Sequence, residues 1–344
     1  MAGSFIVVNL FGSSVLIRVA EAEVGVARLL ADALVDLTGD RSHAVRVSLT
    51  ATRREGHHVL VDECDDSVIA HHRDGRAFLT QVVHRLNRLA LDLDPHRLHL
   101  HAAAVTRVDG TGVLIVGASG AGKSTLATDL LLRGSAYLGD ELIALGAATS
   151  ALGTDEVRPA SGQVVGYPKP ISLKGTSVVR FRDLMPMHTA EGRAELPASS
   201  VGEVVGDASV GVVVFPRYVA GATSASTCIG PTEATRMLLS STMDAERYGA
   251  RSLAVLAGLA VSATCVALTV GDDADAAARI VASIDCPAGA GPLRLGTIGP
   301  DLNVGGAPFD HLAVAMMADG NLAMNGSGTT FGDIAPEQLD RRGV

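Results

Sequence analysis

Gly117-Ala-Ser-Gly-Ala-Gly-Lys-Ser-Thr125 is the stretch that decides the fold of this chain. It fits the pattern G-x-x-x-x-G-K-S/T. An apolar, β-rich run from Gly112 to Val116 leads into it, and helical spacing follows from Leu126 to Leu132. The sequence therefore predicts a strand, a phosphate-binding loop and a helix. The alternative, a Gly-rich turn capped by a serine, would not require that strand and helix.

The composition of the loop follows from how a chain binds phosphate. Backbone N–H groups at a helix N-terminus form an anion site only where the chain passes close to the phosphates, and glycine leaves that room. Lys123 would neutralise the β- and γ-phosphates, and the Ser124 hydroxyl would bind Mg²⁺. ATP and Mg²⁺ are therefore the predicted cofactors. The candidate ATP-binding residues are Gly117, Ser119, Gly120, Ala121, Gly122, Lys123, Ser124 and Thr125.

Composition limits the class of protein. A chain of 344 residues is long enough for two domains. A formal charge of −9, only 3% aromatic residues and no Lys/Arg cluster argue against nucleic acid as a partner. The four cysteines are far apart, form no C-x-x-C pair and follow no signal peptide, which favours a reduced cytoplasm.

One uncharged run, Leu253 to Val270, has to be considered as a membrane span. Gly258, Ser262 and Thr264 interrupt it. It is more typical of a buried helix end followed by a β-branched strand, so no membrane partner is predicted.

The first hundred residues predict a small α+β domain. The strand-like runs are Phe5 to Leu10, Val15 to Val19, Ala44 to Leu49 and Val59 to Val61, and the helical stretches are Val24 to Leu37 and about Arg76 to Leu91.

Eight of the eleven histidines lie between His57 and His101, which raises the question of a metal site. Adjacent histidines on a strand point to opposite faces and no metal-ligand spacing accompanies them, so ordinary solvated or core histidines are the favoured interpretation.

Two features flank the loop and bear on chemistry. His99 and His101 would share one face of a strand, so that one of them could reach the site. Asp140 and Glu141 end an apolar strand, where an open α/β sheet collects its ligands. One carboxylate there can hold Mg²⁺ and another can accept a proton from an attacking hydroxyl. A solvated acidic turn is the alternative.

With these residues in view, the chain resembles the HPr kinase/phosphorylase group of P-loop kinases, whose core is similar to that of ATP-dependent phosphoenolpyruvate carboxykinases. The resemblance covers about residues 98 to 285. It rests on the loop, on His101 in Leu-His-Ala-Ala-Ala-Val, and on Arg133-Gly134 followed by Asp140-Glu141. Tyr167-Pro-Lys-Pro-Ile-Ser-Leu-Lys174 and Val213-Val-Phe-Pro-Arg-Tyr218 are similar to segments of HPr kinase-related kinases of bacterial biosynthetic clusters.

This resemblance implies roles for particular residues. Asp140 would be the base that takes the proton from the acceptor hydroxyl, and Glu141 would assist Ser124 at the metal. The family has two aspartates here, so Glu141 is a departure. His101 would modulate the base or the phosphate. Independently of the resemblance, Lys169, Lys174 and Arg217 are the later cations expected to meet phosphate charge, with Arg217 counted as catalytic; an ordinary surface charge is the alternative for each.

The predicted fold class is thus α/β, with a P-loop kinase core of the HPr kinase/phosphoenolpyruvate carboxykinase type and a smaller N-terminal α+β domain. The expected domains are 1–97, with acceptor recognition, 98–285, catalytic, and 286–344, a Gly-rich C-terminal extension. Residues 178–203 are expected to form an irregular lid or substrate loop. Helices are expected at about Pro231 to Ser240, Asp244 to Leu259 and Asp275 to Ile284.

The expected activity is transfer of the γ-phosphoryl group of ATP to a hydroxyl, most simply a serine of a peptide or small protein. A small-molecule alcohol is the alternative acceptor, and an ATP-binding regulatory protein is the alternative from another class. The family's Gly-rich peptide-binding signature is absent in recognisable form, which argues against HPr itself as acceptor. The resemblance also implies a homo-oligomer.

Overall fold

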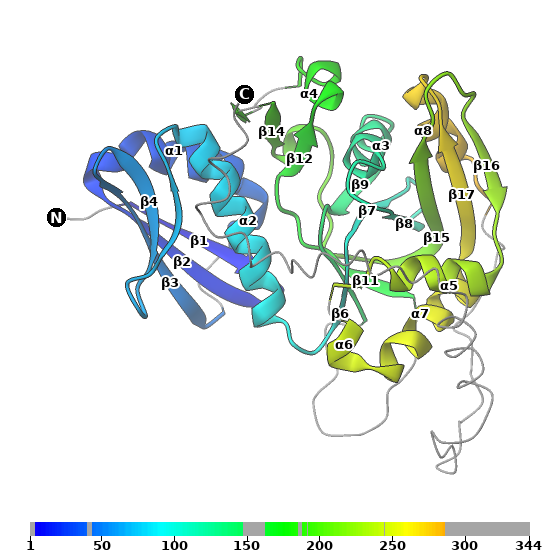
Figure 1. The fold of residues 1–344 in the computed structure, drawn as a ribbon, viewed down its shortest axis with the longest axis horizontal. Helices are drawn as coiled ribbons and strands as arrows, with labels where there is room; N and C mark the ends of the chain where they lie inside the picture. Colours follow the sequence, from blue (N-terminus) through cyan, green and yellow to red (C-terminus); the bar gives the residue numbers. More distant parts are fainter. Residues whose placement is uncertain are drawn as a thin grey trace, which may run out of the picture. The chain divides into compact units, whose positions relative to one another are not determined.

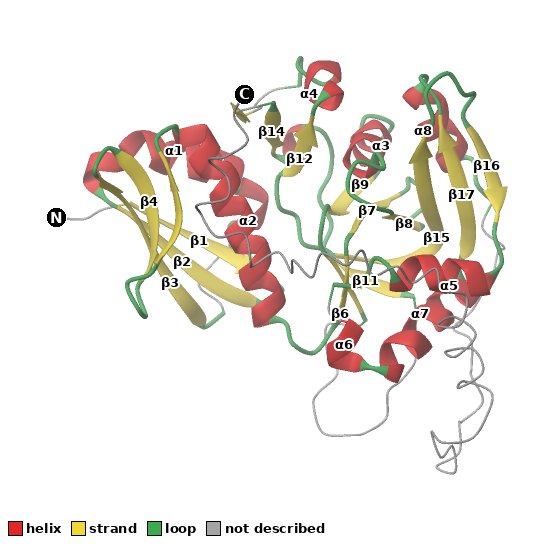
Figure 2. Ribbon diagram, in the orientation of Figure 1, coloured by secondary structure: helices red, strands yellow, loops and turns green. Residues whose placement is uncertain are grey.

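The computed structural model describes residues 4–39, 43–146, 162–184, 188–190, 192–243 and 245–285. The expected C-terminal extension, 286–344, lies outside these residues. Within them the chain is a mixed α/β protein with three β-sheets (Figures 1 and 2). All described residues belong to one compact unit, Met1–Leu293, so the domain boundary after residue 97 stays a prediction.

The N-terminal sheet has five strands in the order β1-β2-β3-β4-β5. They are β1 (Ser4–Leu10), β2 (Ser13–Val19), β3 (Val45–Arg54), β4 (His57–Asp62) and β5 (Val68–His72). The β1–β2 turn places Phe11 and Gly12 at φ 52° and 89°, and two positive φ values match the right-handed twist of a two-residue hairpin. We did not expect β5, a short strand held against β4 by pairing across the sheet.

Two helices cover one face of this sheet (Figure 1). They are α1 (Val24–Ala33) and α2 (Gly75–Leu93), with short 3₁₀ turns at Glu21–Glu23 and Val35–Leu37. Asp74 caps α2 by accepting hydrogen bonds from the backbone N–H groups of Arg76 and Ala77. Phe78 and Leu86 are fully buried against the sheet, so the amphipathic pattern of this stretch is explained by core packing.

The central sheet has nine strands. They are β6 (Leu98–Leu100), β7 (Ala102–Thr106), β8 (Gly112–Val116), β9 (Ala136–Gly139), β10 (Ile143–Leu145), β11 (Gln163–Val165), β15 (Asp207–Tyr218), β16 (Ala225–Cys228) and β17 (Thr264–Val270). Strand β15 is parallel to β8 and β17, while β7 is antiparallel to both β8 and β9. Strands β8, β9, β15 and β17 therefore run in one direction, and their carboxyl ends share one edge of the sheet.

Helices pack on both faces of the central sheet. Alternate residues of β8 pack into two hydrophobic cores, one on each face of the sheet. Val113 and Ile115 contact the core formed with α3 (Lys123–Leu131) and α8 (Ala274–Ala282). Leu114 and Val116 contact the core formed with α5 (Pro231–Leu239) and α7 (Ala250–Ser262). This burial on both sides explains the unbroken apolar character of the strand before the loop.

A third, small sheet precedes β15 and corrects one expectation. It has the order β12-β14-β13 and comprises β12 (Ile171–Lys174), β13 (His188–Ala190) and β14 (Arg193–Leu196). Helix α4 (Thr176–Arg180) and a 3₁₀ turn at Ala198–Ser200 complete it. The segment expected to be irregular, residues 178–203, thus contains regular structure, since Ala194 and Leu196 are buried in the core.

The predicted helix from Asp244 to Leu259 is divided. It forms α6 (Ala245–Tyr248) and α7, separated by Gly249 at φ 52°, a conformation that ends the first helix. The uncharged run after Leu253 is the end of α7 followed by β17, as expected. None of the helices in the described residues is long and apolar enough to cross a membrane.

Candidate active site

The predicted phosphate loop joins β8 to α3, as the sequence pattern indicates. Gly120 and Gly122 have φ of 84° and 94°, values that side-chain-bearing residues rarely adopt. Helix α3 begins at Lys123, so the N–H groups of its first turn, which lack intrahelical acceptors, face this loop. Residues 118 to 120 are exposed, which leaves the loop accessible to an anion.

Lys123 folds back over the loop. Its Nζ donates hydrogen bonds to the carbonyl oxygens of Gly117, at 2.6 Å, and Ala118, at 3.1 Å. The side chain is buried, and this burial lowers the pKa of the ammonium although Asp140 and Glu141 raise it. A desolvated cation at the base of the loop is suited to bind a highly charged anion, because charges interact more strongly away from water.

Asp140 follows β9 and reaches the same edge of the sheet. Its Oδ2 accepts a hydrogen bond of 2.8 Å from the Ser124 hydroxyl, and its Oδ1 accepts one of 3.0 Å from the Glu141 N–H. The side chain is fully buried. The structure therefore places the carboxylate directly beside the first turn of α3.

Glu141 is turned away from Ser124 by its contacts. Its Oε2 accepts a hydrogen bond of 3.0 Å from Asn87 on α2 and lies 3.4 Å from Nζ of Lys169, while its Oε1 lies 3.9 Å from Nζ of Lys174. Burial raises the pKa of Glu141, but the lysines and nearby histidines hold it below its usual value. Its φ of 69° is uncommon for a residue with a side chain and indicates local strain.

The predicted metal ligands are thus not brought together as a pair. Ser124 contacts Asp140, whereas the Glu141 carboxylate contacts two lysines. Among the described residues, no group of three or more His, Cys, Asp or Glu side chains is placed to hold a metal ion.

His101 lies at the break between β6 and β7, which corrects the expectation that it shares a strand face with His99. His99 is fully buried and contacts Asp94, with 3.0 Å between Nε2 and Oδ2. His101 instead has its Nδ1 3.2 Å from the Glu141 carbonyl oxygen and its Nε2 3.1 Å from Nζ of Lys123. These partners assign the proton to Nδ1 and leave Nε2 as an acceptor.

Two other predicted residues lie around the loop. Thr125 shares a hydrogen bond of 2.6 Å with the hydroxyl of Ser177, at the start of α4. Arg217 lies near the carboxyl end of β15, is exposed, and has no hydrogen bond or ion pair to any other described residue. Its neighbour Pro216 lies close to Gly117, since a Cβ on Gly117 would be 3.6 Å from the Pro216 carbonyl oxygen. Arg217 therefore follows a residue that lies close to the loop, and no other described residue pairs with its side chain.

Comparison with known proteins adds little to this geometry. No protein-family model matches the chain, and no curated protein matches it. Among solved structures, Hpr(Ser) kinase/phosphatase from Coxiella burnetii is similar at 20% identity with a TM-score of 0.19, over 36% of this chain and 60% of that chain. The matched region is thus less than two thirds of that protein, and a similarity this low carries no argument about activity.

Sequence reasoning missed some residues of the site. Asn87 and His84 come from α2, three residues apart on a helix whose polar side could equally face solvent. Glu195 on β14 is buried, and its Oε2 accepts a hydrogen bond of 2.8 Å from Ser172, which also accepts one from Lys169. No local pattern marks these residues, because their proximity to Glu141 or Lys169 depends on how distant segments pack.

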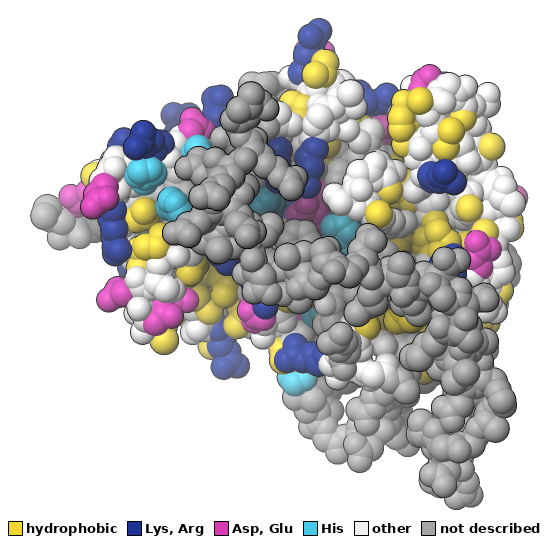
Figure 3. All heavy atoms as spheres, viewed as in Figure 1, with side chains coloured by type: hydrophobic (Ala, Val, Ile, Leu, Met, Phe, Trp, Pro, Cys, Tyr) yellow, Lys and Arg dark blue, Asp and Glu magenta, His cyan; other side chains and the backbone are white. Residues whose placement is uncertain are grey.

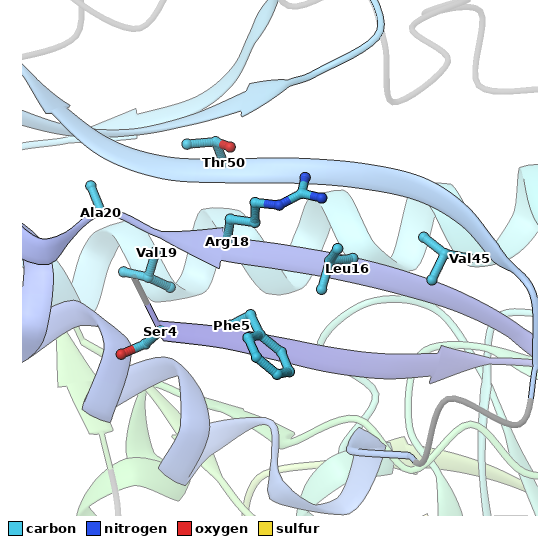
Figure 4. A pocket seen from close by; sticks show the side chains of 8 residues that line it. All are labelled: Ser4, Phe5, Leu16, Arg18, Val19, Ala20, Val45 and Thr50. Carbon is cyan, nitrogen blue, oxygen red and sulfur yellow. The ribbon is translucent and has the colours of Figure 1, made fainter. Parts of the chain in front are cut away.

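A separate hollow lies on the outer face of the N-terminal sheet (Figure 4). Phe5, Arg18 and Thr50 lie side by side across β1, β2 and β3 in it. The Arg18 guanidinium is paired with Glu63, so its charge is already compensated. The lining residues are Ser4, Phe5, Leu16, Arg18, Val19, Ala20, Val45 and Thr50, and this set contains no acid, base or nucleophile arranged for chemistry.

Proposed function

We propose that this protein is an ATP- and Mg²⁺-dependent kinase that transfers the γ-phosphoryl group to a hydroxyl, with a serine of a peptide or small protein as acceptor. The observation that carries the proposal is the 2.8 Å contact between Ser124 and Asp140. It joins the first turn of a helix after a Gly-rich loop to a carboxylate at a strand end, the combination that phosphoryl transfer uses for positioning and charge stabilisation.

The residues present fit a nucleoside triphosphate. Gly120 and Gly122 have open space where a Cβ would stand, so the backbone can approach the phosphates closely. Lys123 brings a buried positive charge to the same place, and exposed Arg217 is free to add a second one. Such groups bind a triphosphate through its charge.

The residues also fit Mg²⁺. The Ser124 hydroxyl is an oxygen donor of the kind that hard cations prefer, and the Asp140 carboxylate beside it supplies negative charge. Glu141, to which the resemblance gave a metal role, is engaged with Lys169 and Lys174, so in this proposal it shapes the site electrostatically. When bound, ATP would supply the transferable phosphoryl group and Mg²⁺ would neutralise part of its charge.

Asp140 is the proposed base. One carboxylate oxygen is held by the Glu141 N–H, which fixes the orientation of the side chain. The other, now facing Ser124, would hold the proton of the acceptor hydroxyl during attack. His101 contacts the Glu141 carbonyl and Lys123. It would therefore hold the residue after the proposed base and the loop lysine in a fixed relative position.

The test is phosphate transfer from labelled ATP to the products of neighbouring genes. Asp140→Asn is expected to reduce transfer by roughly 10²–10⁴-fold, because proton transfer by a positioned base contributes about that much. Asp92→Asn, on the exposed side of α2, is the matched control and is expected to leave transfer unchanged. Full transfer by Asp140→Asn would refute the proposed base, and no transfer to any acceptor would favour the regulatory alternative.

A further inference from the structure

Two basic residues face each other across the small sheet. Lys174 on β12 and Arg193 on β14 are direct partners in the antiparallel register. Like charges at such positions destabilise a sheet, so their pairing is not explained by stability. Arg193 is exposed and has no hydrogen bond or ion pair to another described residue. Lys174 is also exposed, and Glu141 is the carboxylate found beside it, at 3.9 Å.

The described acids near this pair are shared with a buried lysine. Glu141 lies closer to the buried ammonium of Lys169, at 3.4 Å, than to Lys174. The other nearby acid, Glu195, is fully buried, and burial raises its pKa to about 7, so it is only partly ionised at neutral pH. Among the described residues, Glu141, the partly protonated Glu195 and Asp140 are the acids that act on buried Lys169. Lys174 and Arg193 are the exposed cations beside this group.

A histidine from α2 lies near this cluster. His84 is one turn before Asn87, which donates a hydrogen bond to Glu141, and it is within electrostatic reach of Glu141, Lys174 and Arg193. Partial burial of the ring and the nearby cations lower the pKa of His84 although Glu141 raises it, which favours a neutral ring that can donate one hydrogen bond. Figure 3 shows acidic, basic and histidine side chains gathered in a hollow on the face in view.

The position of the cluster relates it to the proposed chemistry. Lys174 contacts the side chain of Glu141, and Asp140 precedes Glu141 in the chain. Lys174 also lowers the pKa of Lys123, so it lies within electrostatic reach of the loop, and an anion held by Lys174 and Arg193 would be near the proposed base.

We propose that Lys174, Arg193 and His84 bind an anionic group on the acceptor, a carboxylate or a phosphate, and so direct its hydroxyl towards Asp140. The inference rests on the proposed kinase function and names its acceptor class: a hydroxyl compound that carries negative charge near the phosphorylated position. The same chemistry is offered by a serine within an acidic peptide segment and by a free hydroxy acid.

Binding without nucleotide tests the site independently of catalysis. Two fluorescent peptides are compared by anisotropy, one with serine flanked by aspartates and one with asparagines in their place. The acidic peptide is expected to bind at least tenfold more tightly, because charge-assisted hydrogen bonds are the stronger ones. The Lys174→Gln/Arg193→Gln double variant is expected to lose this preference. Raising the salt concentration is expected to weaken binding of the acidic peptide to the wild type.

Arg54→Gln, an exposed arginine at the end of β3, is the matched control and is expected to keep the preference. The Lys174→Glu/Arg193→Glu variant is a second test, since it is expected to favour a lysine-flanked peptide instead. Circular dichroism confirms that each variant is folded. Equal affinity for the acidic and neutral peptides, or an unchanged preference in both double variants, would overturn the proposal. Competition by ATP without Mg²⁺ would overturn it as well, by assigning the cations to the nucleotide.

Further experiments distinguish a peptide from a free hydroxy acid as the source of the anion. They also test the anion site separately from the proposed kinase function. If millimolar 3-hydroxypropionate displaces the acidic peptide and is itself phosphorylated, the acceptor is a free hydroxy acid. If only the peptide is phosphorylated, the acceptor is an acidic peptide. Lys123→Ala is expected to abolish ATP binding and leave peptide binding intact. A wild-type protein that binds the acidic peptide but not ATP would refute the kinase proposal while the anion site stands.

Discussion

The Nζ of Lys123 lies 3.1 Å from Nε2 of His101, so the cation of the phosphate loop is hydrogen-bonded to a ring that must be neutral to accept. Burial and, after it, the Lys123 ammonium lower the pKa of His101. Protonation of the ring would place two positive charges in contact. This pair therefore links the electrostatics of the loop to pH in the range where histidine titrates.

The first prediction concerns acid stability. The unfolded chain protonates His101 near pH 6.5, above the lowered pKa of the folded state, so the folded state loses stability as the pH falls through this range. His101→Gln keeps a donor for the Glu141 carbonyl and an acceptor for Lys123 and does not titrate. Its urea-unfolding free energy is expected to change less between pH 7.5 and 5.5 than that of the wild type. The same slope in both would contradict this, and exposed His96→Gln is the control.

The second prediction concerns the loop lysine. Lys123→Ala removes the buried charge that holds the Gly117 and Ala118 carbonyls and faces the proposed phosphates. ATP affinity is expected to fall by roughly 10- to 100-fold, the equivalent of one lost charged interaction of about 1.5–3 kcal/mol. Isothermal titration with ATP and Mg²⁺ measures it. Unaltered affinity would rule out this loop as the triphosphate site.

The third prediction concerns Glu141, the acid with an uncommon positive φ. Glu141→Gln keeps the shape and the contact to Asn87 but removes the negative charge that stabilises buried Lys169. Removing one partner of a buried ion pair costs about 3–5 kcal/mol, and Glu195 can take over part of the role, so a loss of about 1–3 kcal/mol in unfolding free energy is expected. Chemical denaturation checks this. Glu203→Gln, elsewhere in the chain, is the control, and an unchanged stability would show that Lys169 does not depend on Glu141.

Local patterns predicted much of this fold. The glycines of the loop, the helical spacing of α3 and the β-branched run of β17 are each visible within a few residues. These elements could therefore be predicted directly from the sequence. The adjacency of Asp140 to Ser124 agrees with the rule that parallel strands collect ligands at their carboxyl ends. Their catalytic and metal roles stay predictions.

The rest depends on contacts that no local pattern contains. The opposition of Lys174 and Arg193 depends on the register of two strands that α4 and β13 separate in the chain. The contact of Asn87 with Glu141 joins residues 54 positions apart. His99 and His101 differ because the strand breaks between them, and alternation along a continuous strand could not predict that break.

The last prediction concerns Glu195. Burial raises its pKa to about 7, and Lys169 and the Ser172 hydroxyl limit the rise. The unfolded carboxyl has a pKa near 4.5, so Glu195 alone contributes stability that is lost as the pH rises from 4.5 through 7, opposite in sign to the contribution of His101. Glu195→Gln cannot ionise and is expected to lack this decline, on the order of 1–3 kcal/mol at about 1.4 kcal/mol per pKa unit. Unfolding free energies at pH 5 and 8 test it. If the unfolding free energies of the wild type and of Glu195→Gln change by the same amount between pH 5 and 8, the acid is ionised in the fold and Lys169 compensates it fully.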